Sequence, residues 1–438
     1  LETRTRDQME NELSMNIGYE LSASSSLRVN ALYAIKDDPT DVERYTTNLR
    51  VEPNTVMSER EAIPSDRDNW EIGGDYELNL GGGGRFKLLA IANQDNRDSQ
   101  RERFLLGDDG AEEKNLFLGL TSVTEERIVR GSYTTSLSDT GSIEFGLERA
   151  QTTLDSTLAL GAIDATGTPS EAVGGLVPQV VSNASSSVEE IRYEPFAIHN
   201  WTLSPTLSLE STLLYESSEI TQSGGASNQR DFSFVKPKVD LRYNPSTNLQ
   251  LRGSIEKIVN QLSFADFIAI NDETDNDSNT LEGNIDLRQQ WQWRYTFNGE
   301  YRLPNDLGVL NAELFYAQHE DVIDRLDSST SEDNLQSVNG NIGDGIEMGL
   351  NLSASVRATP LGMPNLLITS SLNLQDSEVT DPFLGKKRRF QNYQRGRFTL
   401  FFRHDIPELR VNWGMQYFDR LDAVMSPYDA DDIEFNAS

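Results

Sequence analysis

The sequence contains no cysteine among its 438 residues, so disulfide bonds and thiolate metal ligands are excluded. It also lacks any run of about 18 apolar residues, and a membrane-spanning helix is therefore not expected. This second absence does not exclude a membrane. The strands of a spanning β-barrel alternate apolar and polar residues, and their mean hydropathy is unremarkable.

Basic residues are few, with 38 Lys and Arg against 70 Asp and Glu and a net charge of −32. A phosphate backbone would be repelled, and no basic stripe repeats along the chain, so nucleic acid is excluded as a partner. The first residues show no basic segment followed by an apolar one. We therefore expect that a signal peptide has been removed or that the chain is a fragment.

Alternation of apolar and polar residues with a period of two is the dominant pattern. It is clear over Trp70–Leu80, Val235–Tyr243, Trp291–Leu303 and Ile346–Val356. Amphipathic helices would instead place apolar residues three and four positions apart, and no convincing example occurs. The pattern predicts β-strands with one apolar and one polar face.

The connections between the alternating segments come in two lengths. The short ones carry the Gly, Pro, Asn and Asp of tight turns, at Gly81–Gly84, Ser138–Gly141, Ser204–Thr206, Asn244–Asn248, Pro304–Gly308, Thr359–Asn365 and Asp405–Glu408. The longer ones are polar, at Val51–Asp68, Leu154–Val188, Gln261–Asp286 and Leu326–Gly343. Short and long links alternate, as in a barrel with short periplasmic turns and long extracellular loops.

These segments predict an all-β fold, a large antiparallel transmembrane β-barrel with about 16 strands in this chain. Several strands would run to about 15 residues, whereas strands of soluble proteins usually have about 5–6. Aromatic residues suited to interfacial girdles are Trp70, Trp201, Trp291, Trp293, Tyr301, Tyr316, Trp413 and Tyr417. The competing interpretation is a soluble all-β protein, but no repeat of fixed period supports a propeller or solenoid.

A family resemblance covers the stretch from Phe234 to Phe418. The segments that carry it are Phe234–Tyr243, Asn248–Lys257, Leu262–Phe267, Gly283–Leu287, Trp291–Tyr301, Leu310–Ile323, Gly345–Leu350, Asp376–Pro382 and Lys386–Phe390. In this order they resemble the later barrel of a TonB-dependent receptor. Leu262–Phe267 stands at the family's P-S-F element without the usual Pro, and Gly283–Leu287 resembles its G-N-P-x-L segment with Ile285 in place of Pro.

The resemblance implies a barrel of about 22 strands in the outer membrane of a Gram-negative bacterium. We expect residues 1–438 to be one barrel domain that lacks three strands at each end, the plug domain, the TonB box and the final aromatic-ended strand. An incomplete barrel leaves two unpaired edges, which lipid does not tolerate, so the natural protein is expected to be longer. The implied partners are membrane lipid and lipopolysaccharide, the inner-membrane TonB complex through the plug, and a small-molecule or oligosaccharide ligand.

Charged residues on the polar faces are candidates for the lumen and ligand path: Lys236, Lys238, Asp240, Arg242, Arg252, Glu256, Arg294, Glu300, Arg302, Glu347 and Arg357. A hydrated wall that contacts the plug is the simpler interpretation of this set.

Candidates for extracellular loop contacts are Asp272, Asp275, Asp277, Lys386, Lys387, Arg388 and Arg389. The acidic trio resembles a Ca²⁺ ligand cluster in composition but lacks EF-hand spacing, and a solvated loop tip is the simpler interpretation. The basic run would touch lipopolysaccharide phosphates or an anionic ligand, or form a solvated rim.

Catalysis and cofactors are not predicted. The three histidines, His199, His319 and His404, are isolated in the sequence and make a weak metal or catalytic site. No G-x-S-x-G motif is present. Haem receptors of the resembled family carry a His between the two loop motifs, and none lies between Phe264 and Leu287.

The leading hypothesis, from the family resemblance, is active import of a scarce bulky nutrient, such as a siderophore or an oligosaccharide. The alternatives are a passive porin, a barrel enzyme and a soluble β-rich binding protein.

Overall fold

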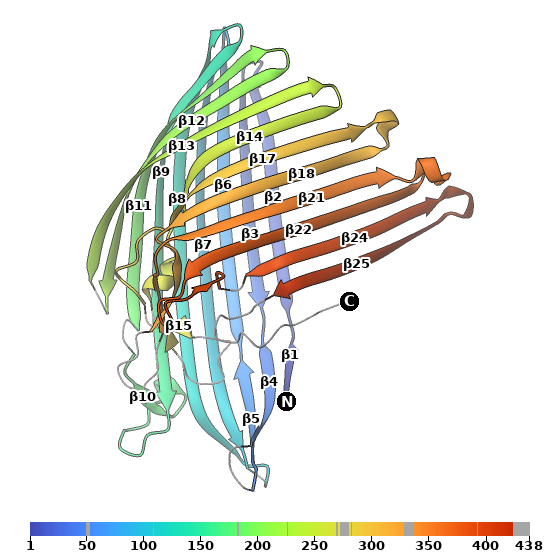
Figure 1. Ribbon diagram of the computed structural model, residues 1–438. Coiled ribbons are helices and arrows are strands. Elements are labelled where there is room, and N and C mark those ends of the chain that lie inside the picture. Colours follow the sequence, from blue (N-terminus) through green and yellow to red (C-terminus); the bar gives the residue numbers. More distant parts are fainter. Residues whose placement is uncertain are drawn as a thin grey trace.

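The computed structural model describes residues 1–49, 53–107, 109–181, 184–225, 227–268, 270–271, 280–281, 283–327, 337–391 and 393–423. Within these ranges the chain forms one curved antiparallel sheet of 21 strands and two small two-stranded hairpins (Figure 1). In the described part, no helix has the length and apolar character needed to cross a membrane.

The first half of the chain contains the longest strands, β7, β8 and β9. The strands of this half are β1 (Glu2–Arg6), β2 (Met9–Ser22), β3 (Ser25–Asp37), β4 (Thr40–Asn48), β5 (Thr55–Ile63), β6 (Ser65–Gly81), β7 (Gly84–Leu106), β8 (Glu112–Ser138), β9 (Gly141–Ala162), β10 (Val177–Gln179), β11 (Ser185–Ser204) and β12 (Leu207–Gly224). β8, with 27 residues, exceeds the about 9–11 residues that a tilted strand needs to cross a membrane. This half of the wall therefore extends well beyond a bilayer.

The strands of the second half are shorter. They are β13 (Asn228–Ser246), β14 (Leu249–Val259), β17 (Trp291–Leu303), β18 (Gly308–Glu320), β21 (Gly345–Arg357), β22 (Leu366–Thr380), β23 (Lys387–Arg388), β24 (Gln394–Ile406) and β25 (Val411–Ala423). The small hairpins are β15 (Ile270–Asn271) with β16 (Thr280–Leu281), and β19 (Ile323–Asp327) with β20 (Ser337–Asn341). Five 3-10 turns complete the described elements: η1 (Glu171–Val173), η2 (Phe264–Phe267), η3 (Pro304–Asp306), η4 (Thr359–Leu361) and η5 (Pro407–Leu409).

Sixteen strands follow one another across the wall, each paired with the next strand along the chain. Their order is β2, β3, β6, β7, β8, β9, β11, β12, β13, β14, β17, β18, β21, β22, β24 and β25. β1, β4 and β5 continue β2, β3 and β6 past the interruptions at Asp7, Pro39 and Pro64. Proline cannot donate a ladder hydrogen bond, which explains the breaks at Pro39 and Pro64. The predicted number of strands is confirmed.

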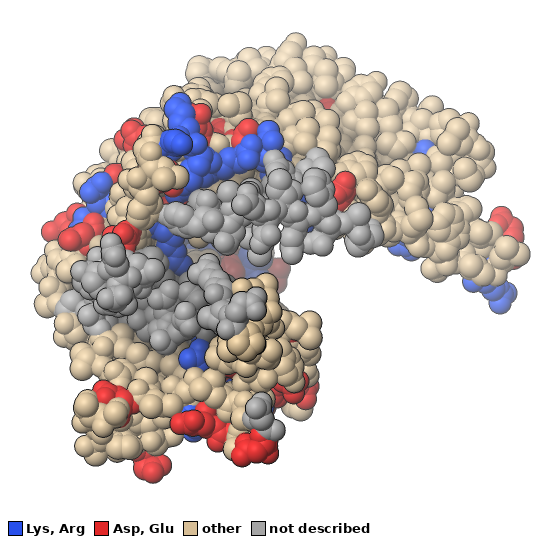
Figure 2. Space-filling view, turned by 60° about the horizontal axis from the view of Figure 1, so that its bottom comes forward, with Lys and Arg blue, Asp and Glu red and all other residues tan. Residues whose placement is uncertain are grey.

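The sheet curves around a hollow interior without closing (Figure 2). Within the described residues β2 pairs only with β3 and β25 only with β24, so these two strands are its edges. All 14 side chains of β2 are exposed. A large antiparallel barrel wall is confirmed as the fold, and this stretch does not close it.

The tight turns lie at one end of the wall, where every predicted short connection is found. Two predicted long loops are wrong in extent. β5 and β6 occupy most of Val51–Asp68, and β9 continues to Ala162 before β11 begins at Ser185. Along this part of β9 the outward residues Asp155 and Thr157 are polar and exposed, whereas Leu154 and Leu158 are buried on the inner side. The outward face lacks the apolar side chains that a membrane-spanning strand needs.

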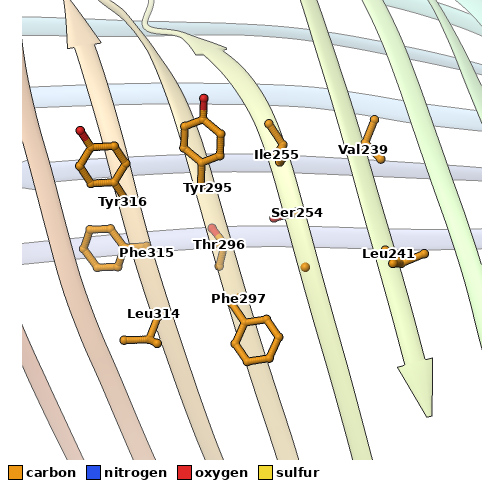
Figure 3. A pocket seen from close by; sticks show the side chains of 11 residues that line it. Val239, Leu241, Ser254, Ile255, Tyr295, Thr296, Phe297, Leu314, Phe315 and Tyr316 are labelled. Carbon is orange, nitrogen blue, oxygen red and sulfur yellow. The ribbon is translucent and has the colours of Figure 1, made fainter. Parts of the chain in front are cut away.

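The two faces of the wall differ as the alternation predicts. Figure 3 shows Ile255, Tyr295 and Leu314 projecting from one side of the sheet, whereas Ser254, Thr296 and Phe315 project from the other. The outward apolar side chains are exposed, for example Val239 at 47% and Phe297 at 53%. They form a shallow depression of about 540 Å³ on the outer surface, where acyl chains would lie.

Replacing Leu314 by Lys is expected to lower the free energy of unfolding by about 2 kcal/mol, because the side chain faces outward near the middle of β18 and is 55% exposed. The matched variant Leu310→Lys lies two residues from the start of β18 and should cost less than about 1 kcal/mol, since the penalty falls toward the interface. Urea unfolding in lipid vesicles measures both. Equal costs at the two depths would contradict a lipid-facing surface.

Candidate functional site

A cluster of ion pairs lies on the inner face of β11, β12 and β13. Lys236 Nζ lies 2.6 Å from Glu194 Oε1 and 2.7 Å from Glu216 Oε2. The two carboxylates are almost fully buried, with Glu216 only 1% exposed. Gln289 donates a hydrogen bond of 3.2 Å to the other oxygen of Glu216. Lys236 was predicted for the lumen, but its two partners were not.

The next predicted residues also face the interior and pair with one another. Lys238 Nζ lies 3.3 Å from Glu256, and Arg252 Nε lies 2.6 Å from Asp240 Oδ2, with Asp240 only 5% exposed. Lys236, Lys238, Asp240, Arg252 and Glu256 therefore form one polar strip across β13 and β14. This strip supports the interpretation of the set as a hydrated wall.

For the other predicted lumen residues, no ion pair with this strip is found among the described residues. Arg294 lies over the ring of Phe315, 4.2 Å from its centroid. Glu347 accepts a hydrogen bond of 3.2 Å from the Tyr393 hydroxyl. Four lie close to the tight-turn end: Arg242, Glu300, Arg302 and Arg357. Glu300 and Arg302 pair with each other at 2.9 Å, and Arg242 stands directly opposite Arg252 in the β13–β14 register.

The connection between β14 and β17 folds inward against this wall. Its residues Leu262, Phe267, Ile268 and Leu287 pack on wall residues of β9, β11 and β12, which are Leu154, Val188 and Ile220. Leu287 and Val188 are both 0% exposed. Burial of this apolar cluster anchors the loop inside the hollow of the sheet.

Wall side chains also bind the main chain of the loop. Gln222 donates a hydrogen bond of 2.8 Å to the carbonyl of Phe267, and Asn228 donates one of 2.8 Å to the carbonyl of Ile285. Arg230 donates to the carbonyl of Leu287. These bonds satisfy backbone oxygens that burial would otherwise leave without partners.

The two loop motifs noted in the sequence lie against each other. A Cβ on Gly283 would overlap the carbonyl carbon and oxygen of Phe267, so only glycine fits there. The N–H of Asn284 donates to the carbonyl of Asp266 at 2.7 Å. The Leu262–Phe267 and Gly283–Leu287 segments therefore act as one clasp on the inner wall.

The connection between β18 and β21 packs on this clasp. Asn284 donates to the carbonyl of Asn339 at 2.8 Å, and Asn339 donates to Asp266 Oδ1 at 2.7 Å. Asn341 donates hydrogen bonds of 2.9 Å to the carbonyls of Arg288 and Asp321. The second long loop is thus held by the first.

The third long connection, between β22 and β24, carries the basic run. Arg388 Nη1 lies 2.9 Å from Asp324 and Arg388 Nε lies 2.8 Å from Asp381, and its side chain is only 13% exposed. The predicted solvated rim is therefore wrong for Arg388, which joins the third loop to the second. Lys387 pairs with Glu378, Arg389 lies 2.8 Å from Asp376, and Lys386 is exposed. Asp272, Asp275 and Asp277 lie outside the described residues.

Acid is expected to loosen the third loop. Burial opposes the charge of Asp381, but the backbone N–H groups of Leu384 and Phe383 and the guanidinium of Arg388 outweigh burial and lower the pKa of this carboxyl. A lowered pKa stabilises the folded loop at any pH above the ordinary value of 3.8. That stabilisation declines as the pH falls below it.

The rate of pepsin cleavage between Phe383 and Leu384, normalised to a free peptide, is therefore expected to rise as the pH is lowered from about 4.5 to about 2.5. Asp381→Asn should be cleaved rapidly over this whole interval and lose most of the pH dependence. A wild-type rate without pH dependence would contradict the role of Asp381.

The three histidines occupy different places. His199 lies beside Trp201, and His404 accepts a hydrogen bond of 3.2 Å from the Trp413 indole. His319 is only 7% exposed and lies 3.5 Å from Glu347. Among the residues that the structure describes, no group of three or more potential metal-ligating side chains is found.

Comparison with known proteins places the fold. The family model for the TonB dependent receptor-like β-barrel matches residues 16–435. This chain belongs to the TonB-dependent receptor-like β-barrel family. Its place is accordingly the outer membrane of a Gram-negative bacterium. No curated protein matches the chain in sequence.

Solved structures agree with this family at the level of the fold. The alcaligin outer-membrane receptor FauA from Bordetella pertussis is 13% identical with a TM-score of 0.56, over 96% of this chain and 67% of that one. The siderophore receptor PiuA from Acinetobacter baumannii is 11% identical with a TM-score of 0.58, over 95% and 71%. The ferripyoverdine receptor of Pseudomonas aeruginosa is 10% identical with a TM-score of 0.58, over 96% and 61%. The chain thus spans about two thirds of the length of these TonB-dependent receptors.

Proposed function

We propose that this chain forms the barrel wall of an active importer that carries a bulky nutrient across the outer membrane. The observation that carries the proposal is the clasp. An inward-folded loop is fixed to a charged inner wall by the Leu287 cluster, in a chain that belongs to the TonB-dependent receptor-like family. A passive channel does not need a filled interior, whereas a gated importer does.

The energy step and the partners belong to this proposal. A plug domain would block the bore, and the inner-membrane TonB complex would displace it. The outer apolar surface would contact lipid, and the exposed Lys386 and Lys387 would meet lipopolysaccharide phosphates. No catalytic activity is part of the proposal. The solved relatives named for siderophores make an iron chelate one candidate ligand, and an oligosaccharide is the other.

Growth of the native organism tests this function. Deletion of the gene is expected to abolish growth on one scarce solute of a panel of iron chelates and oligosaccharides, and a protonophore should stop uptake of that solute. A porin would instead support uptake after de-energisation. The purified full-length protein would then also conduct ions steadily in a planar bilayer, and this pair of results would refute active import.

A further inference from the structure

A polar recess lies on the inner wall beneath the clasp, and none of the three residues of the Lys236 cluster lines it. It has a volume of about 490 Å³, which is within the range of small-molecule sites. Its floor is built by β6 to β9 and β11, and its roof by the first residues of the inward-folded loop.

The floor carries hydroxyl groups on neighbouring strands. Ser122 stands directly opposite Ser156 in the β8–β9 register, and Thr152 stands between Glu126 of β8 and Glu190 of β11. A hydroxyl can donate and accept a hydrogen bond at the same time. The floor therefore complements a ligand that itself carries many hydroxyls.

Charged groups of both signs surround these hydroxyls. Arg67 lies 2.6 Å from Asp95, so this cation already has an anionic partner inside the recess. Glu126 accepts a hydrogen bond of 3.1 Å from Asn93. With Glu190, the recess holds three carboxylates against the two guanidinium groups of Arg67 and Arg97. This excess of negative charge disfavours an anionic ligand.

Glu190 is the residue that points to a ligand. It is only 7% exposed, lines the recess, and its Oε1 has no hydrogen-bond partner in the structure. A buried acceptor without a donor is costly, and such groups are rare in proteins. A ligand hydroxyl that donates to Oε1 would remove this cost.

The roof is apolar and aromatic. Phe264, Leu262 and Ile268 cover the recess from the loop side, opposite the polar floor. An entirely polar ligand would leave this side unmatched, and an entirely apolar ligand would leave Glu190 unsatisfied. A ring with hydroxyls at its edge and C–H groups on its face fits both sides.

We propose that this recess binds a neutral sugar ring of an oligosaccharide, with Glu190 accepting a hydrogen bond from a ligand hydroxyl and Phe264 packing on the face of the ring. The inference rests on the proposed import function and names its substrate class. The loop that forms the roof is the one that the clasp holds, so sugar binding and the position of this loop are coupled.

The test is calorimetric titration of the purified full-length receptor in detergent with malto-, cello-, xylo- and mannohexaose, and with an iron(III) tris-catecholate. At least one hexaose is expected to bind. Glu190→Ala should weaken that binding by about 10-fold or more, as expected for a lost hydrogen bond to a charged group. Heat-modified gel mobility checks that the Glu190→Ala variant still folds.

Glu189→Gln is the matched control. Glu189 is the neighbouring residue on β11 and points to the opposite side of the sheet, where it accepts a hydrogen bond from Gln151. The Glu189→Gln variant should bind the hexaose with the affinity of the wild type. Failure of every hexaose to bind, or an unchanged affinity in Glu190→Ala, would overturn the inference. Energised uptake of the iron chelate alone would refute the sugar class while leaving active import intact, whereas steady ion conductance would refute import itself.

Discussion

Replacing Lys236 by Met is expected to lower the free energy of unfolding by about 3 kcal/mol or more, because Glu194 and Glu216 would remain buried without their cation. Glu216 also accepts a hydrogen bond from Gln289 of the inward-folded loop. The variant would therefore leave the charge of Glu216 unbalanced at the point where the loop contacts the wall. Urea unfolding in lipid vesicles, followed by tryptophan fluorescence, measures the change.

The matched control is Lys238→Met, one inward position further along β13. Lys238 pairs with Glu256, but both side chains are partly exposed, at 35% and 26%. Exposed pairs contribute less than about 1 kcal/mol, so this variant should be nearly as stable as the wild type. The double variant Lys236→Met with Glu216→Gln should regain part of the free energy of unfolding that Lys236→Met loses. Equal costs for the two single variants would show that burial of the Lys236 cluster has no energetic role.

Replacing Leu287 by Asp is expected to release the inward-folded loop from the wall. Truncating a buried Leu alone costs about 2–5 kcal/mol, and an unpaired carboxylate in the same apolar cluster adds to this. The barrel wall should stay folded, because its strands pair independently of the loop. Amide hydrogen exchange of residues 283–290 should rise strongly, while exchange in β17 and β18 stays slow.

Gly283→Ala should act in the same direction, since the added Cβ meets the backbone of Phe267 and cannot be accommodated by a side-chain movement. Leu384→Asp provides the control, because Leu384 is 71% exposed in another loop and its replacement should change stability by less than about 0.5 kcal/mol. A slow-exchanging loop in Leu287→Asp would mean that contacts other than the apolar cluster hold it.

The sequence alone predicted the wall well and the interior poorly. Inside the membrane, successive residues of a strand face lipid and the watery lumen in turn, so apolar and polar residues alternate, as they do over Val235–Tyr243. Beyond the membrane the outward face is polar as well, as at Asp155 and Thr157, even where Leu154 and Leu158 are buried on the inner side. The apolar outward face that marks a membrane-spanning strand is therefore missing there. The extent of the long loops was misjudged for this reason.

The site was predicted in composition but not in pairing. Lys236 was recognised as inward-facing, yet its partners Glu194 and Glu216 lie 42 and 20 positions away on other strands. Only the register of β11, β12 and β13 brings them together. The alternation of Glu190, Arg192 and Glu194 was a readable signal that one face of β11 is charged. The burial of Arg388 had no local signal, because its partner Asp324 belongs to a different loop.

The hydrogen bonds from Gln222, Asn228 and Arg230 all end on carbonyl oxygens of the loop. Every residue type presents the same carbonyl, so at these three points the wall holds the backbone of the loop, in addition to the apolar side chains that it buries at Leu262, Phe267, Ile268 and Leu287. The side chain at a position such as Ile285 can therefore be replaced without loss of the hydrogen bond that its carbonyl accepts. A receptor built this way can acquire new ligand contacts through point mutations in the loop while its attachment stays the same.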